Sequence, residues 1–132
     1  EFLCRESRLL LSSVDLSIEK AFNLVETLGG LFIPAHVNRK AYGLIANLGF
    51  VPTEIDIAAV EVSRHLTPVD ALNQYPQLKG YPVIQNGDVH RLDEFLGSLI
   101  FDIKIPSVNE IKKALLNMEN RSFSVKSFDN TI

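Results

Sequence analysis

The sequence predicts an α/β fold in which helices cover a parallel sheet or part of a barrel. Short apolar segments alternate with amphipathic helical stretches along the chain, and most of the helical stretches begin at a capping residue or end at glycine. Because parallel strands need covered crossover connections, this alternation favours parallel strands. A stretch of 132 residues holds one hydrophobic core. We therefore expect a single α/β domain over residues 1–118 and a polar, frayed tail over residues 119–132.

The first third of the sequence predicts a strand, a helix and a second strand. The apolar run Leu9–Leu11 predicts a short strand, and Ser17 is placed to cap the helix that follows. The inward positions of that helix are Ile18, Ala21, Phe22, Val25 and Leu28. After two glycines, the apolar segment from Leu31 to His36 predicts a strand covered on both faces, although Pro34 has no N–H to donate.

The middle of the sequence predicts two further strands, each preceded by a helix. Residues Ala41 to Leu48 predict a helix, and Ile57 to Val62 predict a buried strand. Thr67 is followed by proline at the first helical position and aspartate at the third, which is a strong helix start. The other strand is expected from Tyr81 to Gln85.

The last third predicts a short helix, a strand and a final amphipathic helix. The short helix is expected near Leu92 to Leu96, and the strand from Leu99 to Ile105. Ser107 and Glu110 are spaced as a capping box for a helix that ends at about Asn117.

Composition excludes some classes of function. With 13 basic and 16 acidic residues the net charge is -3, which gives no field suited to duplex binding through many phosphates. The single cysteine, Cys4, cannot form an internal disulfide, so we expect a reducing compartment, the cytoplasm. Every apolar run is far shorter than the roughly 20 residues of a transmembrane helix, so we expect no membrane segment.

Residues that can bind metal stand at the predicted strand ends. His36 ends the apolar segment that starts at Leu31, and Glu61 lies near the end of the strand expected from Ile57. Asp88 and His90 follow the strand expected from Tyr81. The carboxyl ends of parallel strands converge at one edge, where chemistry is done in such folds. Imidazole and carboxylate together bind zinc, iron or manganese. Three such ligands, His36, Asp88 and His90, would leave a position for water, whose lowered pKa supplies a nucleophile for ester hydrolysis.

A structural interpretation of the same residues stays open. Histidines at strand ends often donate to a nearby carbonyl, and aspartate after Asn-Gly is often a turn former. Glu61 would then pair with Arg39 or Arg64, because a carboxylate at a buried strand end is usually neutralised. His65 is expected to face solvent, and Cys4 has no neighbouring base that would make it a nucleophile.

Three motifs resemble the C-terminal half of the PHP family, named for polymerase and histidinol phosphatase, whose members are metal-dependent phosphoesterases. The stretch LLLSSVDLSIEKAFNLVETLGGLFIPAHVNR, residues 9–39, resembles the helix, double glycine and A-H-P strand end of the family. IAAVEVSR at 57–64 is similar to its D-x-I-E-V segment, and GDVH at 87–90 is similar to its S-D-A-H motif. The likeness extends to the helix IPSVNEIKKAL at 105–115.

The resemblance implies a distorted seven-stranded (β/α) barrel of the PHP type with two or three divalent ions, zinc, manganese or iron, at the carboxyl ends of its strands. His36 matches the histidine of the A-H motif, and Asp88 and His90 match the D-x-H motif, all metal ligands in the family. Glu61 matches an acidic position that we do not assign to the metal. The sequence departs from the family pattern at two positions, where Val37 replaces a proline and Gly87 replaces a serine.

The resemblance also implies a class of substrate and a part of the barrel that these residues do not include. The substrate is expected to be a phosphorylated small molecule or a nucleic-acid end, with Arg39 or Arg64 binding the phosphate. The H-x-H motif that opens the family does not precede residue 1, so we expect the N-terminal half of the barrel to be a missing partner and the isolated chain to be inactive. Exposed sheet edges would then favour self-association. The alternative is a non-catalytic α/β regulatory or interaction module of a larger protein.

Overall fold

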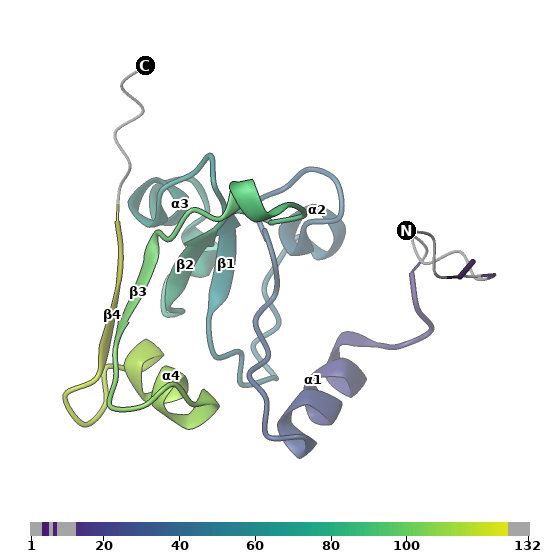
Figure 1. Cartoon of the computed structure of the whole chain (residues 1–132). Helices are drawn as coiled ribbons and strands as arrows, with labels where there is room; N and C mark the ends of the chain where they lie inside the picture. Colours follow the sequence, from purple (N-terminus) through teal and green to yellow (C-terminus); the bar gives the residue numbers. More distant parts are fainter. Residues whose placement is uncertain (1–3, 6, 8–12, 127–132) are drawn as a thin grey trace.

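The computed structural model describes residues 4, 5, 7 and 13–126, and these form a mixed α/β fold (Figure 1). Strands β1 (Val60–Ser63) and β2 (Val83–Asn86) form a parallel pair in which Val60 lies opposite Val83. Strands β3 (Leu99–Asp102) and β4 (Ser122–Val125) form an antiparallel pair. The parallel arrangement predicted for the middle strands is confirmed. The strand expected at Leu9–Leu11 lies outside the described residues.

The helices begin at the residues that the sequence indicates. Helices α1 (Ile18–Thr27), α3 (Pro68–Gln74) and α4 (Val108–Leu115) each follow a hydroxyl side chain that accepts a backbone N–H of the first turn. These hydroxyl groups, which satisfy amides that otherwise have no partner in the helix, belong to Ser17, Thr67 and Ser107. Two short 3-10 helices, η1 (Pro76–Leu78) and η2 (Leu92–Glu94), complete the helical elements.

Helix α2 (Leu44–Leu48) is shorter than predicted because the chain turns before it. Tyr42 has a positive φ of 60°, which a right-handed helix does not contain. A Cβ at position 43 would collide with the Arg39 carbonyl, so Gly43 permits this close approach. The prediction of an inward Leu28 is also wrong, because this residue caps the end of α1 and its side chain is 85% exposed.

The predicted strand from Leu31 to His36 runs beside β1 but is not a regular strand. The N–H of Ala58 donates to Phe32 O at 3.3 Å, and the N–H of Glu61 donates to Pro34 O at 3.0 Å. Between these two hydrogen bonds the segment advances by two residues, from Phe32 to Pro34, whereas the chain beside it advances by three, from Ala58 to Glu61. In a regular parallel pair, both strands advance by the same number of residues. Pro34 has no N–H with which to continue a ladder, and this explains the irregularity.

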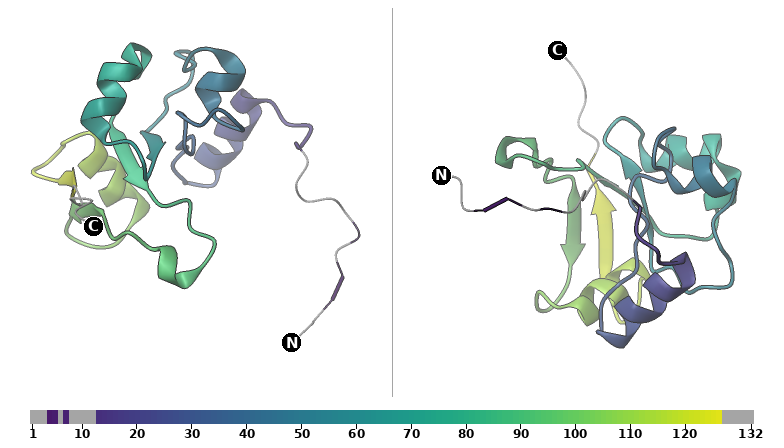
Figure 2. Two further views of the ribbon diagram at one scale, coloured as in Figure 1. Left: turned by 90° about the horizontal axis from the view of Figure 1, so that it is seen from above. Right: turned by 90° about the vertical axis from the view of Figure 1, so that its right-hand side faces the viewer.

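The end of the chain differs most from the prediction. The tail expected from residue 119 is wrong over β4, whose Phe123 lies opposite Phe101 of β3. The ring centroids of these two residues are 6.4 Å apart. Figure 2 shows β3 and β4 side by side, with α4 near one end of the pair. The parallel packing expected for every strand is therefore wrong for β3, and the remaining tail residues, 127–132, lie outside the described part.

Side chains of the parallel strands enter two apolar clusters, one on each face. Val60, Val62 and Val83 belong to a cluster that Phe22 of α1 and Ala71 of α3 also join. Ile84 belongs to the other cluster, with Leu115 of α4. Because residues of a strand alternate between faces, burial on both sides is the expected state of covered parallel strands. In the described residues, no helix is long and apolar enough to cross a lipid bilayer.

Candidate functional site

The candidate site lies at the carboxyl ends of β1, β2 and the segment beside β1. Glu61, in β1, joins its neighbours on both sides through its carboxylate. Its Oε1 accepts the His36 N–H at 3.3 Å, and its Oε2 accepts Asn86 Nδ2 at 2.9 Å. Asp88 follows two residues after Asn86. The strand ends thus gather the residues around Glu61, as the sequence predicts for the edge of a parallel sheet.

A cavity of about 430 Å³ opens beside this carboxylate. Its lining includes the polar residues Glu61, Asn86 and Asp88. It also includes four large apolar residues, Val89, Phe95, Leu96 and Leu99. Small-molecule sites are typically of this size, with largely apolar walls and a few polar groups.

The carboxylate of Asp88 pairs with the guanidinium of Arg39. Arg39 Nη1 lies 2.6 Å from Asp88 Oδ2, with side-chain exposures of 46% and 27%. Asp88 has a positive φ of 51°, a conformation in which aspartate is more common than most residues. Our prediction that Arg39 would neutralise Glu61 is therefore wrong, because this arginine pairs with the aspartate instead. Sequence reasoning missed the pair, since 49 residues separate its members and no local pattern links them.

The ring of His90 is held by the main chain next to it. Its Nδ1 lies 2.7 Å from the carbonyl oxygen of Asp88. Because a carbonyl only accepts, Nδ1 carries the proton in this contact, and in the neutral ring Nε2 is then the nitrogen with a free lone pair. Histidines that bind metals usually have one nitrogen oriented in this way. The His90 N–H also donates to Glu94 Oε2 at 2.7 Å, and this hydrogen bond is the main cause of the lowered pKa of Glu94.

His36 has a buried nitrogen without a partner. Within the described residues, His36 Nδ1 is a buried side-chain atom that makes no hydrogen bond. Its backbone has a φ of 33°, which is unusual for a residue other than glycine. A buried polar atom left without a partner is costly, and such atoms often mark a place for water, a metal or a ligand. This imidazole is therefore suited to bind a group absent from the polypeptide.

Arg64 binds the loop that carries the D-x-H motif. Its Nε and Nη2 donate to Gly87 O at 3.1 and 2.7 Å, and Nη2 also donates to Glu94 O at 3.1 Å. A Cβ at position 87 would lie 2.7 Å from Nη2 and 3.0 Å from Glu94 O. Any side chain at position 87 would therefore displace the Arg64 guanidinium, and glycine avoids this. Arg64 does not form the predicted pair with Glu61, because its guanidinium is turned to these carbonyls.

The candidate metal ligands do not form a complete site in this structure. Among the described residues, no group of three His, Cys, Asp or Glu side chains is arranged to hold a metal ion. The donor atoms suit a divalent metal one by one, since His36 Nδ1 has no partner and His90 Nε2 has a lone pair. Asp88 would have to exchange Arg39 for the cation. His65 is exposed, as predicted, and Cys4 is exposed as well.

Asn86 is the site residue that sequence reasoning missed. Its amide donates to Glu61 and lines the cavity. The signal was present, because a polar residue ends a buried strand directly before Gly87. The sequence interpretation concerns only the aspartate after this Asn-Gly step, as a turn former, and gives Asn86 no role.

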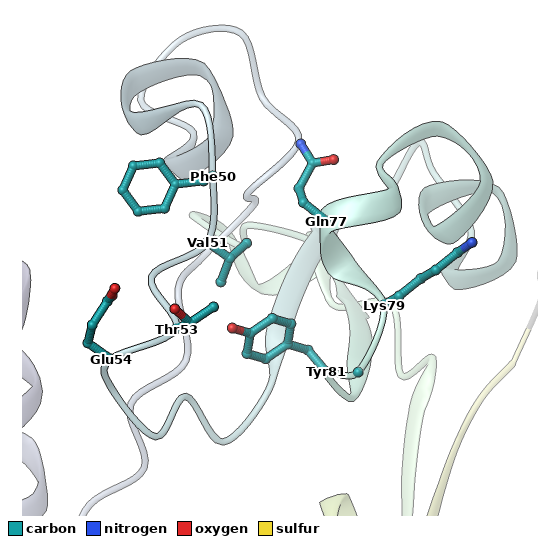
Figure 3. A pocket seen from close by; sticks show the side chains of 8 residues that line it. Phe50, Val51, Thr53, Glu54, Gln77, Lys79 and Tyr81 are labelled. Atoms are coloured by element: carbon teal, nitrogen blue, oxygen red, sulfur yellow. The ribbon is translucent and has the colours of Figure 1, made fainter.

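A larger cavity, of about 620 Å³, lies at the opposite end of the parallel strands (Figure 3). Its lining includes Tyr81, which precedes β2 and whose hydroxyl donates to Pro52 O at 3.3 Å. In Figure 3 the Lys79 side chain extends away from the Tyr81 ring, and Glu54 lies on the far side of Thr53. The charged groups therefore do not converge, and the cavity beside Glu61 is the better candidate site.

No family model matches the chain, and searches of curated proteins and of solved structures find no match either.

Proposed function

We propose that the chain is the C-terminal part of a metal-dependent phosphoesterase of the PHP type, within a partial (β/α) barrel of parallel strands. The observation that supports this most is the unpartnered Nδ1 of His36, at the strand edge where Glu61 and Asp88 lie. The imidazole of His36 has one buried nitrogen without a partner, its backbone N–H contacts a carboxylate, and imidazole and carboxylate together are ligands of zinc, manganese and iron. The compartment that we propose is the cytoplasm.

In this proposal His36, Asp88 and His90 hold the metal, which is zinc, manganese or iron. When bound, such an ion supplies the nucleophile for hydrolysis of a phosphate ester by lowering the pKa of water towards 7. The Asp88 carbonyl orients the His90 ring, so that Nε2 is available. Arg39 leaves Asp88 and binds the phosphate of the substrate, for which a guanidinium fork is well suited.

Arg64 has a supporting role in the same proposal. Its hydrogen bonds to Gly87 O and Glu94 O fix both ends of the loop that contains Asp88 and His90. The substrate is a phosphorylated small molecule or a nucleic-acid end, and the cavity beside Glu61 receives the part of it next to the phosphate. The remaining strands and ligands come from an N-terminal half of the barrel outside these 132 residues, where edge strands otherwise favour self-association.

Phosphate release from 4-nitrophenyl phosphate tests this proposal, using the chain together with its N-terminal half and added Mn²⁺. We expect His90→Ala to reduce the rate at least a hundredfold, because it removes a ligand. His65→Ala is the matched control, since this histidine is exposed and lies outside the site. Equal rates for the two variants would reject the mechanism.

The alternative, a non-catalytic regulatory or interaction module, is favoured by a different observation. Arg39 already neutralises Asp88, and the described residues contain no three-ligand group. A module of this kind would fold normally and bind no divalent metal. Zinc is added to metal-free protein to test this alternative. It is supported if the Arg39 and Asp88 side chains stay paired.

A further inference from the structure

We propose that Glu61 is the positioning residue of the site, because its carboxylate holds the loops of His36 and Asp88 in register across β1. The consequence for metal binding rests on the proposed function. The positioning itself rests on contacts within this chain and can be tested without a metal.

The two oxygens of Glu61 bind on opposite sides of its strand. Oε1 accepts the backbone N–H of His36 at 3.3 Å, and Oε2 accepts the side-chain amide of Asn86 at 2.9 Å. Asn86 is the last residue of β2, whereas His36 follows the segment on the other side of β1. One half-buried carboxylate, on the second residue of β1, therefore connects β1 to the last residue of β2 and to the His36 loop on its other side.

The His36 loop depends on Glu61 through two consecutive amides. The N–H of His36 donates to the carboxylate, and the N–H of Val37 donates to the main-chain oxygen of Glu61 at 2.8 Å. His36 has a φ of 33°, and a conformation of this kind persists only where its surroundings fix it. Proline at position 37, which the resembling family commonly has, could not donate the second bond. The His36 loop is thus held by two hydrogen bonds that Glu61 accepts.

The Asp88 loop depends on Glu61 through Asn86. The amide bound by Oε2 stands two residues before Asp88, which has a positive φ of 51°. Gly87, between them, is held by Arg64. Glu61 and Arg64 therefore fix the beginning of this loop from two directions, and loss of the Glu61 contact would leave Arg64 alone to hold it.

A polarity swap tests the role of this carboxylate. Glu61→Ala removes both acceptor oxygens, whereas in Glu61→Gln alone the Asn86 amide can rotate and accept from the new amide. In the double variant Glu61→Gln with Asn86→Asp, the glutamine amide donates to the new carboxylate, so the connection is restored with its polarity reversed. Asn86→Ala is a milder variant, which removes one contact and keeps Glu61. The readouts are the backbone amide signals of His36 and Val37 in metal-free protein and the affinity for Zn²⁺.

We expect Glu61→Ala to shift both amide signals and to weaken zinc binding about tenfold or more, as loss of outer contacts does at metal sites. The double variant should regain the wild-type amide signals and most of the affinity. Asn86→Ala should shift the same signals by less. Unchanged signals in both Glu61→Ala and Asn86→Ala, or a folded double variant whose signals stay as in Glu61→Ala, would overturn the proposal. If wild-type protein binds no zinc but the signals move and recover as expected, positioning by Glu61 stands and the phosphoesterase proposal fails.

Discussion

Arg39 Nη1 lies 2.6 Å from Asp88 Oδ2, so an ion pair spans the candidate site from the loop after His36 to the loop after β2. The pair is partly exposed, which makes it weak enough to exchange, because exposed ion pairs contribute only about 0.2–1 kcal/mol. A metal cation and this guanidinium would compete for one carboxylate. The relative affinity of Asp88 for the two cations decides whether it pairs with Arg39 or binds the metal.

Replacing Arg39 should therefore favour the metal. We expect Arg39→Gln to tighten zinc binding roughly twofold to fivefold, since it removes a competitor worth about 0.2–1 kcal/mol. Competition titration with a chelator measures the affinity. Lys40→Gln is the control, because Lys40 is the next residue, is exposed, and its substitution removes the same positive charge. Weaker binding in Arg39→Gln than in Lys40→Gln would contradict the competition.

Serine at position 87 should destabilise the loop. Its Cβ would lie 2.7 Å from Arg64 Nη2 and 3.0 Å from Glu94 O, so the arginine must give up hydrogen bonds to carbonyls. We expect Gly87→Ser to lower the free energy of unfolding by about 1–2 kcal/mol, measured by urea denaturation. In an Arg64→Ala background the same substitution should cost less, since the clash with Nη2 is gone. Equal costs in both backgrounds would show that Arg64 is not the reason for glycine.

Acid should weaken the contact between α4 and the segment before β4. Hydrogen bonds from Arg121, and then from the Lys104 N–H, hold the pKa of Glu110 at about 2, below its ordinary value of 4.5. Because the folded pKa is the lower one, the carboxylate stabilises the fold above about pH 4.5, and this contribution is lost as the pH falls towards 2. Urea unfolding of wild type and Glu110→Gln should differ most near pH 6 and converge on acidification. A difference independent of pH would contradict this assignment.

Truncating the side chain of Phe123 tests whether β4 contributes to the fold. Phe123 packs against the cluster of Leu115 and opposite Phe101. It is half-buried, so we expect Phe123→Ala to cost about 2 kcal/mol, less than the 3–5 kcal/mol of a fully buried phenylalanine. Ser124→Ala, on the exposed side of β4, should change stability by less than about 0.5 kcal/mol. Equal thermal stabilities for the two variants would mean that this segment does not hold the core.

Local chemistry made the helices and the middle strands predictable. Ser17, Thr67 and Ser107 identify helix starts because their hydroxyls satisfy backbone amides within three residues. Continuous apolar residues lead into both strands, from Ile57 to Val60 and at Val83 and Ile84, because both faces are buried, and that pattern is readable from the sequence. The gathering of polar residues at one edge then follows from the parallel direction alone.

Other features depend on contacts that no local pattern reveals. Strand β4 reads S-F-S-V, a short alternation after a polar turn, and only pairing with β3 makes it a strand. Glu110 looks like the second half of a capping box, but its carboxylate instead accepts from Lys104 N–H and Arg121. The partner of Arg39 could not be predicted from the sequence either, because two carboxylates, Glu61 and Asp88, were both expected near strand ends at the same edge of the sheet.

Calorimetric titration of the metal-free chain with Zn²⁺ tests the central claim, that His36 helps to hold a metal, most directly. The proposal predicts an ion bound by the wild type whose affinity falls at least tenfold in His36→Ala, where the unpartnered Nδ1 is lost, and stays unchanged in His65→Ala. Zinc affinity that is absent in the wild type, or that is the same in all three proteins, would contradict it.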